Sequence, residues 1–492
     1  MALNIKPSLG IFLALISISC LEAQTFQDFR TRVNAAPESG RTAIVDSFIT
    51  AAGSLPFIEQ DTLAHYIYRG TASSVTVPGD ANGWDPGAFP MTRLSTTNLW
   101  YHTHIFESDA RLDYKLVLNG SNWILDPRNP HQVSGGFGPN SELRMPDYEP
   151  PAEIDFNANI PHGALRDTTF FSSNMGNSRT VRVYTPPFYD STNQSYPVVL
   201  FHDGLDYISL AHANYVIDNL TAQNRIAPMI AVFVPANAAR RHEEYATGLQ
   251  AAFTKFIVEE ITPWLDRRYR TLTEPESRAM IGASDGGNIS LWIGLKHPEL
   301  FGNVAAQSSN VESNVHSGYD SSPQRDLKLY LDLGAYDVPV LLPRVRNFIP
   351  VLESKGYEFK YLEFHDGHSW GNWRGHIDNA LEMFFPSSAT PVEDDTPLPT
   401  DFSLFQNFPN PFNPTTTIVF ALARTAPARL QIHNARGQVV STLLNQYLPA
   451  GRYATEWEGT DFRGVPLPSG VYVYRLVIDG RPLAARKLLL LR

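Results

Sequence analysis

The sequence is nearly free of cysteine, and basic residues are outnumbered. Cys20 is the only thiol in 492 residues, which excludes a disulfide framework. The net charge is −11, with 39 Lys and Arg against 50 Asp and Glu, which argues against nucleic acid or an anionic membrane surface as main partner. No ligand cluster has the spacing of a metal site, so no metal or organic cofactor is expected.

Long apolar runs are also missing beyond the N-terminus, so no transmembrane segment is expected in the mature chain. Residues 1–23 resemble a secretory signal peptide, with an apolar run from Ile11 to Ile18. Cleavage after Ala23 is expected, which removes Cys20. A lipoprotein site at Cys20 is the alternative, but Ser17 stands where such a site has a large aliphatic residue.

What is present is a folded, multidomain composition: 43% hydrophobic and 18% charged residues. Residues 24–65 have apolar side chains at helical spacing, and residues 66–150 alternate strand-like runs with Gly/Asn turns, which predicts a small β-sandwich. Residues 151–385 repeat a strand–helix–strand pattern. This predicts a mostly parallel sheet with helices on both faces.

The C-terminal quarter is set off by a linker. Residues 386–401 hold four prolines and four acids, too many to pack a core. Residues 402–492 are again β-rich with Gly/Pro turns, which predicts a second, separate β-sandwich. The predicted fold is therefore an α/β domain with a mostly parallel sheet, flanked by two small β-sandwich domains.

The stretch RAMIGASDGG places Ser284 between glycines, directly after an apolar strand and before a helical pattern. This G-x-S-x-G context is typical of a nucleophile elbow, in which a serine sits on a sharp strand-to-helix turn. The motif alone is weak, because an ordinary Gly/Ser loop would also match it. The strand and helix on either side favour Ser284 as a nucleophile.

A serine nucleophile needs a base and an acid that orients the base, and in this fold they follow in the order acid, His. Asp337 lies just past the end of the strand LKLYLDLG and is the predicted acid; Asp332, inside that strand, is its rival. His368, in the loop after the next strand, is the predicted base. His365 is expected to pack structurally, and His376 to lie on the following helix.

Backbone N–H groups must hold the oxyanion that forms during acyl transfer. One is expected from Asp285, directly after the nucleophile. The other is expected from the loop in VVLFHDGLDY, at Gly204 or Leu205, and the sequence does not decide between them.

Several ordered motifs resemble the enterochelin-esterase and feruloyl-esterase branch of the α/β-hydrolases. They lie within residues 68–385 and are YRG, GDANGW, SNWILDPRNP, GPNSELRMP, FHDG, RRHEEY, GASDGG and DGHSWGNW. The resemblance implies a triad of Ser284, Asp337 and His368. Asp285 departs from it, because members often carry methionine there. An acid beside an oxyanion is unfavourable unless it points away or is paired.

The same resemblance suggests substrate contacts. Arg240, Arg241 and Tyr245 match a segment that lines the acyl pocket, although ion pairs with neighbouring acids explain the arginines equally well. Trp370 and Trp373 flank His368 and either wall an aromatic acyl site or cover the core, with the core favoured.

The N-terminal sandwich resembles early-set domains related to glycogen-binding modules. Trp84, Lys115 and Trp123 match positions that contact sugar in the carbohydrate-binding members. In esterases the same domain more often packs beside the active site, so glycan binding is the less favoured reading. Trp100 is expected in the core.

The last ninety residues resemble a type IX secretion sorting domain, through FQNFPNPFNPTTTIVF, WEGTDFRGVPLPSGVYVYRL and RKLLLLR. This implies a Gram-negative bacterium, Sec export and passage to the cell surface or medium by the type IX machinery. A generic immunoglobulin-like module would explain the sandwich but not the NFPNPFNP run.

The sequence thus predicts a secreted serine carboxylic-ester hydrolase. Acetyl or hydroxycinnamoyl esters of polysaccharide are the favoured substrates, and catecholate siderophore lactones come second. A surface glycan-binding protein with a silent hydrolase fold is the alternative from another class.

Overall fold

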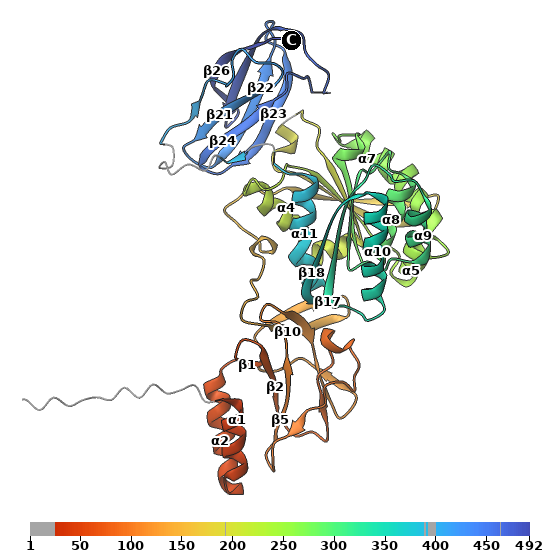
Figure 1. Cartoon of the computed structure of the whole chain (residues 1–492), viewed down its shortest axis with the longest axis vertical. Helices are drawn as coiled ribbons and strands as arrows, with labels where there is room; N and C mark the ends of the chain where they lie inside the picture. The colour runs from red at the N-terminus through yellow and green to blue at the C-terminus, as the bar shows by residue number, and fades with distance from the viewer. Residues whose placement is uncertain (1–24, 192, 388–389, 392–399, 463) are drawn as a thin grey trace, which may run out of the picture.

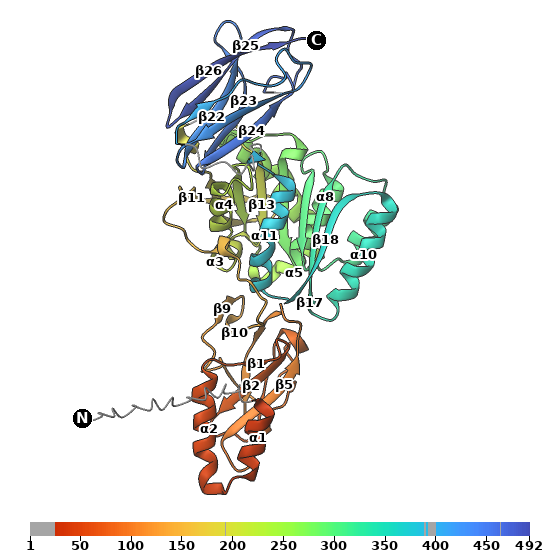
Figure 2. The same cartoon turned by 60° about the vertical axis from the view of Figure 1, so that its left-hand side comes forward.

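The computed structural model describes residues 25–191, 193–387, 390–391, 400–462 and 464–492. Three parts follow one another along the long axis: an N-terminal part (red and orange), a central part (yellow to cyan) and a C-terminal part (blue) (Figure 1). The view turned by 60° has the same order (Figure 2). The predicted signal peptide and most of the predicted linker lie outside the described residues.

An eleven-stranded sheet forms the centre of the molecule. In spatial order its strands are β11 (Ala164–Ser172), β12 (Asn177–Thr185), β14 (Ile230–Val234), β13 (Val198–His202), β15 (Arg278–Ala283), β16 (Asn303–Gln307), β17 (Lys328–Tyr336), β18 (Glu358–Gly367), β6 (Arg111–Tyr114), β10 (Gly138–Arg144) and β9 (Gln132–Gly135). From β14 to β6 neighbouring strands run parallel, and the outer pairs are antiparallel.

Helices cover both faces of the parallel strands. One face carries α5 (Arg241–Ala246), α6 (Gln250–Lys255), a π-helical turn (Phe256–Ile261), α7 (Thr262–Arg268), α8 (Asp285–Lys296), α9 (Ser313–Ser321) and α10 (Leu341–Lys355). The other carries α3 (Gly204–Ser209), α4 (Ala213–Ala222) and α11 (Trp370–Phe384). Short 3₁₀ turns span Asp80–Asn82, Ala152–Ile154, Tyr189–Ser191, Ala238–Arg240 and Pro275–Ser277.

The sequence of β13 shows why two helical layers are needed. Val198 and Leu200 belong to the hydrophobic cluster on one face, and Val199 and Phe201 to the cluster on the other. Both faces of an uninterrupted apolar strand must be kept from water, which a parallel sheet between helices achieves. The predicted α/β-hydrolase architecture is confirmed for this part of the chain.

The N-terminal part begins with α1 (Phe26–Ala35) and α2 (Glu38–Ala52). They pack on a four-stranded sheet in the order β1 (Phe57–Glu59), β2 (Leu63–Arg69), β5 (Leu99–Ile105) and β4 (Thr92–Arg93). A three-stranded sheet holds β3 (Val75–Thr76), β7 (Leu116–Leu118) and β8 (Asn122–Ile124). The helical part of the predicted segment 24–65 therefore ends at Ala52, and strands begin before residue 65.

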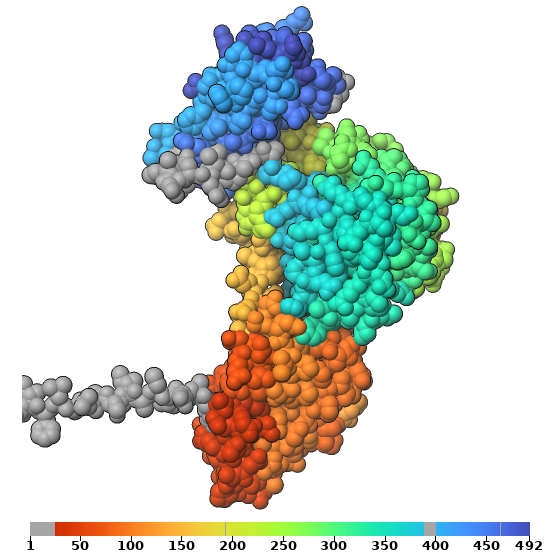
Figure 3. All heavy atoms as spheres, viewed as in Figure 1, coloured from red at the N-terminus to blue at the C-terminus, as the bar shows by residue number. Residues whose placement is uncertain are grey.

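The predicted sandwich of residues 66–150 is not a closed unit. Its strands β6, β9 and β10 extend the central sheet, because β18 runs on to Gly367 and pairs with β6 at Asp366 and Arg111. In the space-filling view the orange N-terminal part lies directly against the teal surface of the central part (Figure 3). The N-terminal and central parts share one sheet.

The C-terminal part is a sandwich of two four-stranded sheets. One has the order β19 (Thr390–Pro391), β24 (Gly451–Trp457), β21 (Thr416–Leu422) and β20 (Ser403–Leu404), and the other β23 (Val439–Leu448), β22 (Ala426–His433), β25 (Gly470–Ile478) and β26 (Arg481–Leu490). Its inward side chains form a core of their own. Residues 390–391 of the predicted linker pair with β24.

Within the described ranges, no helix combines the length and apolar character needed to cross a membrane.

Because the C-terminal sandwich has a separate core, removing residues 402–492 should leave the rest of the chain folded. The contacts between the two parts include a 2.7 Å hydrogen bond from Asn445 to Gln194 and the stacked rings of Phe188 and Tyr447, which contribute little compared with either core. Calorimetry should show one transition lost and the midpoint of the other shifted by only a few degrees. Aggregation of the truncated chain would show that the sandwich supports the central part.

Candidate active site

Ser284 occupies a strained turn between β15 and α8. Its backbone has φ 58° and ψ −121°, a conformation that costs a non-glycine residue free energy and is found mostly at functional sites. The turn closes tightly, because a Cβ at Gly282 would overlap the backbone of Gly286. Glycine at position 282 lets the strand turn into the helix with the serine at the corner.

His368 and Asp337 meet at the ends of neighbouring strands. Asp337 follows β17, His368 follows β18, and His368 Nδ1 lies 2.8 Å from Asp337 Oδ1. The Asp337 side chain is fully buried and that of His368 is partly exposed. The Trp373 ring stands perpendicular to the imidazole, 5.0 Å away between centroids. A buried carboxylate on Nδ1 holds the imidazole with Nε2 free to take a proton.

The rival side chains have other partners. Asp332 is buried beneath the sheet edge, where it accepts from the Gln307 side chain and the Ser308 N–H, and burial raises its pKa to about 6. His365 pairs with Asp109 of the N-terminal part at 2.6 Å.

His376 lies on α11 with its ring stacked on Phe364 at 3.4 Å between centroids. Of the candidate acids and bases, only Asp337 and His368 are hydrogen-bonded to each other within the described residues.

Ser284 and His368 open on the same cavity, of about 870 Å³, between the N-terminal and central parts. The central part contributes one wall and the N-terminal part the facing wall. The lining residues from the N-terminal part are Trp84, Asp113, Lys115, Trp123, Gly135, Gly136, Phe137 and Asn140. A bound molecule that reaches Ser284 therefore lies between two parts of the chain.

Two helices begin at the residues predicted to hold the oxyanion. The first N–H groups of a helix have no intrahelical acceptor, and α8 begins at Asp285 and α3 at Gly204. The chain enters α3 through Asp203 in the left-handed region. Leu205 lines the cavity, whereas Gly204 is buried where a Cβ would overlap the backbone of Phe233. This placement favours Leu205 over Gly204 as the cavity-facing N–H.

The Asp285 carboxylate is neutralised by its neighbours. Asn310 Nδ2 donates to Oδ1 at 2.6 Å, and Oδ2 lies 3.0 Å from His242 Nδ1 and 3.5 Å from Arg241 Nη1. Because the Asp285 carboxylate is paired in this way, its charge does not oppose a negative charge that develops next to Ser284.

Arg241 is a central cation of this region. It forms a two-pronged ion pair with Asp203, at 2.9 and 2.6 Å, and donates to the Ala283 carbonyl at 3.0 Å. Burial is the largest single influence and lowers its pKa, but the attraction and hydrogen bonds of Asp203, together with the attraction of Tyr245 and Asp285, leave the pKa above its ordinary value. Arg241 lines the cavity and, through Asp203 and the Ala283 carbonyl, connects the turn before α3 with the turn before α8.

Two predicted pocket residues do not line the cavity. Arg240 is exposed and pairs with Glu243 at 2.7 Å. Tyr245 is fully buried behind the site, where its hydroxyl accepts from the Asp203 N–H at 3.0 Å. The neighbouring His202 is also fully buried, which lowers its pKa to about 3 and keeps it neutral. The substrate contacts of Arg240 and Tyr245 therefore stay predictions, and the ion pair of Arg240 with Glu243 is the alternative that the sequence left open.

Trp370 and Trp373 lie in the core, the position that the sequence favoured, and they also border the cavity. Both belong to the hydrophobic cluster beneath α11, and both also line the cavity. Their rings are nearly perpendicular, with centroids 4.9 Å apart.

The predicted glycan-contact residues Trp84, Lys115 and Trp123 all line this cavity rather than a remote surface. Trp84 donates its indole N–H to Asp80 at 3.0 Å, whereas Trp123 is 43% exposed. Phe137, fully exposed at the tip between β9 and β10, was missed by the sequence analysis. An aromatic residue inside the GGFG turn was the available signal.

No group of three or more His, Cys, Asp or Glu within the described ranges has the arrangement of a metal site.

Comparison with known proteins gives two family matches. Residues 172–384 match a family described as putative esterase, and residues 410–479 match the FlgD Ig-like domain. These ranges coincide with the central sheet downstream of β11 and with most of the C-terminal sandwich.

Curated relatives fall on the same region. The chain is 28% identical over 234 residues to the uncharacterized protein YjcH of Bacillus subtilis, covering 45% of this chain and 97% of that one. It is 30% identical over 206 residues to an endo-1,4-beta-xylanase/feruloyl esterase of Xylanibacter ruminicola, covering 38% of this chain but 27% of that one. An iron(III) enterobactin esterase of Dickeya dadantii is 24% identical, with 47% and 59% covered.

Among solved structures, a ferric enterobactin esterase from Salmonella typhimurium superposes with a TM-score of 0.61 at 18% identity, covering 69% of this chain and 98% of that one. At this identity the likeness shows the fold alone. The match of residues 172–384 to the family described as putative esterase covers less than half of the chain, and together with this superposition it supports an α/β-hydrolase fold for the central part.

Proposed function

We propose that this protein is a serine carboxylic-ester hydrolase with Ser284 as nucleophile, His368 as base and Asp337 as the acid that orients it. The observation that carries the proposal is that the strained Ser284 and the His368–Asp337 pair open on one cavity. The relatives named as esterases support the reaction class.

In the proposed reaction His368 Nε2 takes the proton of the Ser284 hydroxyl as its oxygen attacks the ester carbonyl carbon. The tetrahedral oxyanion accepts hydrogen bonds from the N–H of Asp285 and of Leu205, with Gly204 as the alternative second donor. His368 then returns the proton to the departing alcohol, leaving an acyl-serine. His368 takes a proton from water as the water oxygen attacks the acyl carbon, and it returns that proton to Ser284 Oγ as the acyl–oxygen bond breaks and the carboxylic acid leaves.

The proposed substrates are acetyl or hydroxycinnamoyl esters of polysaccharide. Support comes from the similarity to a protein named a feruloyl esterase and from a cavity of about 870 Å³ walled by aromatic side chains, which suits a ring and part of its attached sugar. Trp84, Lys115 and Trp123 would contact the sugar side. Catecholate siderophore lactones remain the second candidate, supported by the enterobactin esterase relatives.

We also propose that the protein is exported. Residues 1–23 would direct Sec export, and residues 402–492 would act as a type IX sorting domain that brings the enzyme to the surface or medium of a Gram-negative bacterium. The match of residues 410–479 to an Ig-like domain agrees with a sandwich there, and the NFPNPFNP run supports the sorting role.

The triad proposal predicts that Ser284→Ala or His368→Ala lowers kcat for p-nitrophenyl acetate by roughly 10³-fold or more, because the covalent and proton-transfer steps are lost. The thermal midpoint of Ser284→Ala should stay close to that of the unchanged protein. His368→Ala removes the partner of the buried Asp337 and should lower the midpoint, so its folding is checked separately by circular dichroism.

Asp337→Asn and Asp332→Asn form a matched pair. Both acids are buried, Asp332 in the middle of β17 and Asp337 just past its end, but only Asp337 contacts His368. Asp337→Asn should lower kcat severely, whereas Asp332→Asn should lower it only mildly. Greater damage at Asp332 would show that the assignment of the acid is wrong.

The substrate proposal predicts that Trp123→Ala raises KM on feruloylated or acetylated polysaccharide and leaves methyl ferulate turnover unchanged. Contacts remote from the ester add binding only for the polymer. Phe171→Ala, an exposed aromatic on β11 away from the cavity, is the control and should change neither. Equal losses of activity on the polysaccharide and on methyl ferulate would show that Trp123 has a structural role. Faster turnover of a catecholate trilactone than of the polysaccharide or methyl ferulate would favour siderophore lactones as the substrate.

The export proposal predicts that deleting residues 402–492 in the native host traps active enzyme in the periplasm. Fractionation followed by an esterase assay measures this. Surface or medium activity of the truncated protein at the level of the full chain would contradict the sorting role.

A further inference from the structure

The segment that carries His368 lies against the N-terminal part. β18 ends at Gly367 and the chain turns at His368, where the Ser369 N–H donates to the Gly367 carbonyl at 3.1 Å. His365 pairs with Asp109, and Ser369 bonds with Arg111, both on the N-terminal side. His368 points the other way, to Asp337.

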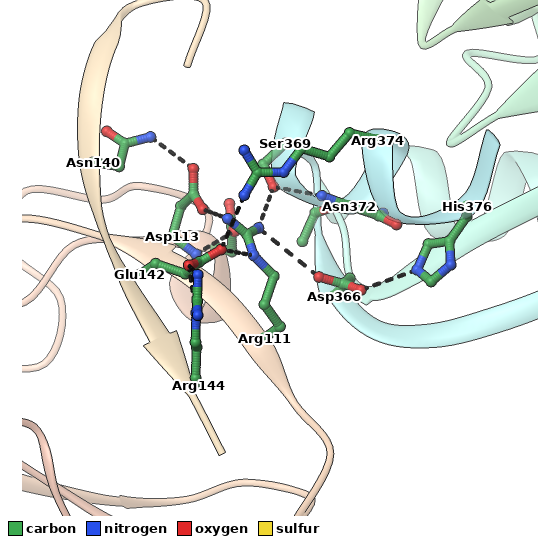
Figure 4. A network of polar contacts seen from close by, with 12 residues as sticks. Arg111, Asp113, Asn140, Glu142, Arg144, Asp366, Ser369, Asn372, Arg374 and His376 are labelled. Atoms are coloured by element: carbon green, nitrogen blue, oxygen red, sulfur yellow. Dashed lines mark hydrogen bonds and ion pairs between the residues drawn. The ribbon is translucent and has the colours of Figure 1, made fainter. Parts of the chain in front are cut away.

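Arg111 of β6 is the fully buried centre of these contacts (Figure 4). Its Nη1 donates to Ser369 Oγ at 2.9 Å, its Nη2 to Asp113 at 2.5 Å and its Nε to Glu142 at 2.6 Å. Asp366 lies 3.9 Å from Nη1. The guanidinium therefore touches the residues on both sides of Gly367 and His368.

The guanidinium is held by groups that do not belong to the His368 segment. Glu142 is also paired with Arg144, and Asn140 donates to Asp113 at 2.8 Å. Arg111 is thus oriented from within the N-terminal part, and its third donor position points to Ser369 (Figure 4).

Ser369 connects this network to the start of α11. Its Oγ accepts from Arg111 and, at 3.5 Å, from the Asn372 N–H, as the N-cap of the helix. Close packing secures the rest of the segment. A Cβ at Gly367 would overlap the Asp80 side chain, and a Cβ at Gly371 would overlap the Arg111 guanidinium.

We propose that Arg111 is a positioning residue that acts through Ser369 to hold His368 in line with Ser284. The inference rests on the proposed esterase function and extends it. The N-terminal part is a component of the catalytic unit as well as a wall of the cavity. Its carboxylate and guanidinium groups touch no reacting atom, and they act by fixing the segment on which the base stands.

The test avoids removing Arg111 itself, because that would leave Asp113 and Glu142 buried without their cation and endanger folding. Ser369→Ala removes only the bridging hydroxyl. Ser369→Thr restores a hydroxyl at the same place. Arg144→Gln is the control, since Arg144 pairs with the same Glu142 but does not contact residues 365–374.

Ser369→Ala should lower kcat for p-nitrophenyl acetate by about 10-fold or more with KM unchanged, because small displacements of a catalytic group are costly. Ser369→Thr should recover most of this loss, and Arg144→Gln should stay within about twofold of the unchanged protein. Gly371→Ala should also lower kcat by displacing the guanidinium, although alanine favours the helix.

A readout independent of turnover is the downfield proton NMR signal of His368 Nδ1–H, together with hydrogen exchange of residues 366–374. Both should change in Ser369→Ala and return in Ser369→Thr. An unchanged kcat and an unchanged signal in Ser369→Ala would overturn the proposal. So would a loss of activity that only follows a loss of folded protein. If the unchanged protein does not hydrolyse esters, the proposed function fails, while the NMR and exchange results still decide the positioning role.

Discussion

The buried guanidinium of Arg111 is the constraint on which the arrangement of this protein depends. Taking a guanidinium out of water costs several kcal/mol, and good geometry with hydrogen-bonded partners has to offset that cost. Here all three nitrogens have partners, from Asp113, Glu142 and Ser369. Because the last of these belongs to the central part, the cation is satisfied only when the N-terminal and central parts are docked.

Docking in turn creates the cavity. The pairing of β18 with β6 continues the central sheet into the N-terminal part, and the facing walls enclose the space into which Ser284 and His368 open. The strain at Ser284 is supported by a second set of buried charges, in which Arg241 joins Asp203 and Asp285. Two arginines, one from each side, thus organise the nucleophile turn and the base segment.

The sequence was informative where a local motif has one geometric meaning. GASDGG predicted the turn at Ser284, and strand ends predicted the positions of Asp337 and His368, because carboxyl ends of parallel strands meet at one edge. Their catalytic roles stay predictions. The short apolar strands, separated by stretches of helical length, predicted both helical layers of the central part.

The sequence did not predict which distant strands pair in the sheet. Nothing local to RLDY shows that β6 joins the edge of a sheet whose other strands lie far along the chain, so residues 66–150 were expected to close on themselves. Tyr245 was assigned to the pocket by motif position, but its hydroxyl is used by the Asp203 backbone. Phe137 was overlooked because the sequence does not show that a cavity lies beside this exposed aromatic side chain.

The central claim, that Ser284 is the nucleophile, is tested most directly by titrating the full chain with a fluorophosphonate and mapping the adduct by peptide mass spectrometry. The account predicts one adduct per chain, on Ser284; no adduct, or an adduct on a neighbouring serine such as Ser308 or Ser309, would contradict it.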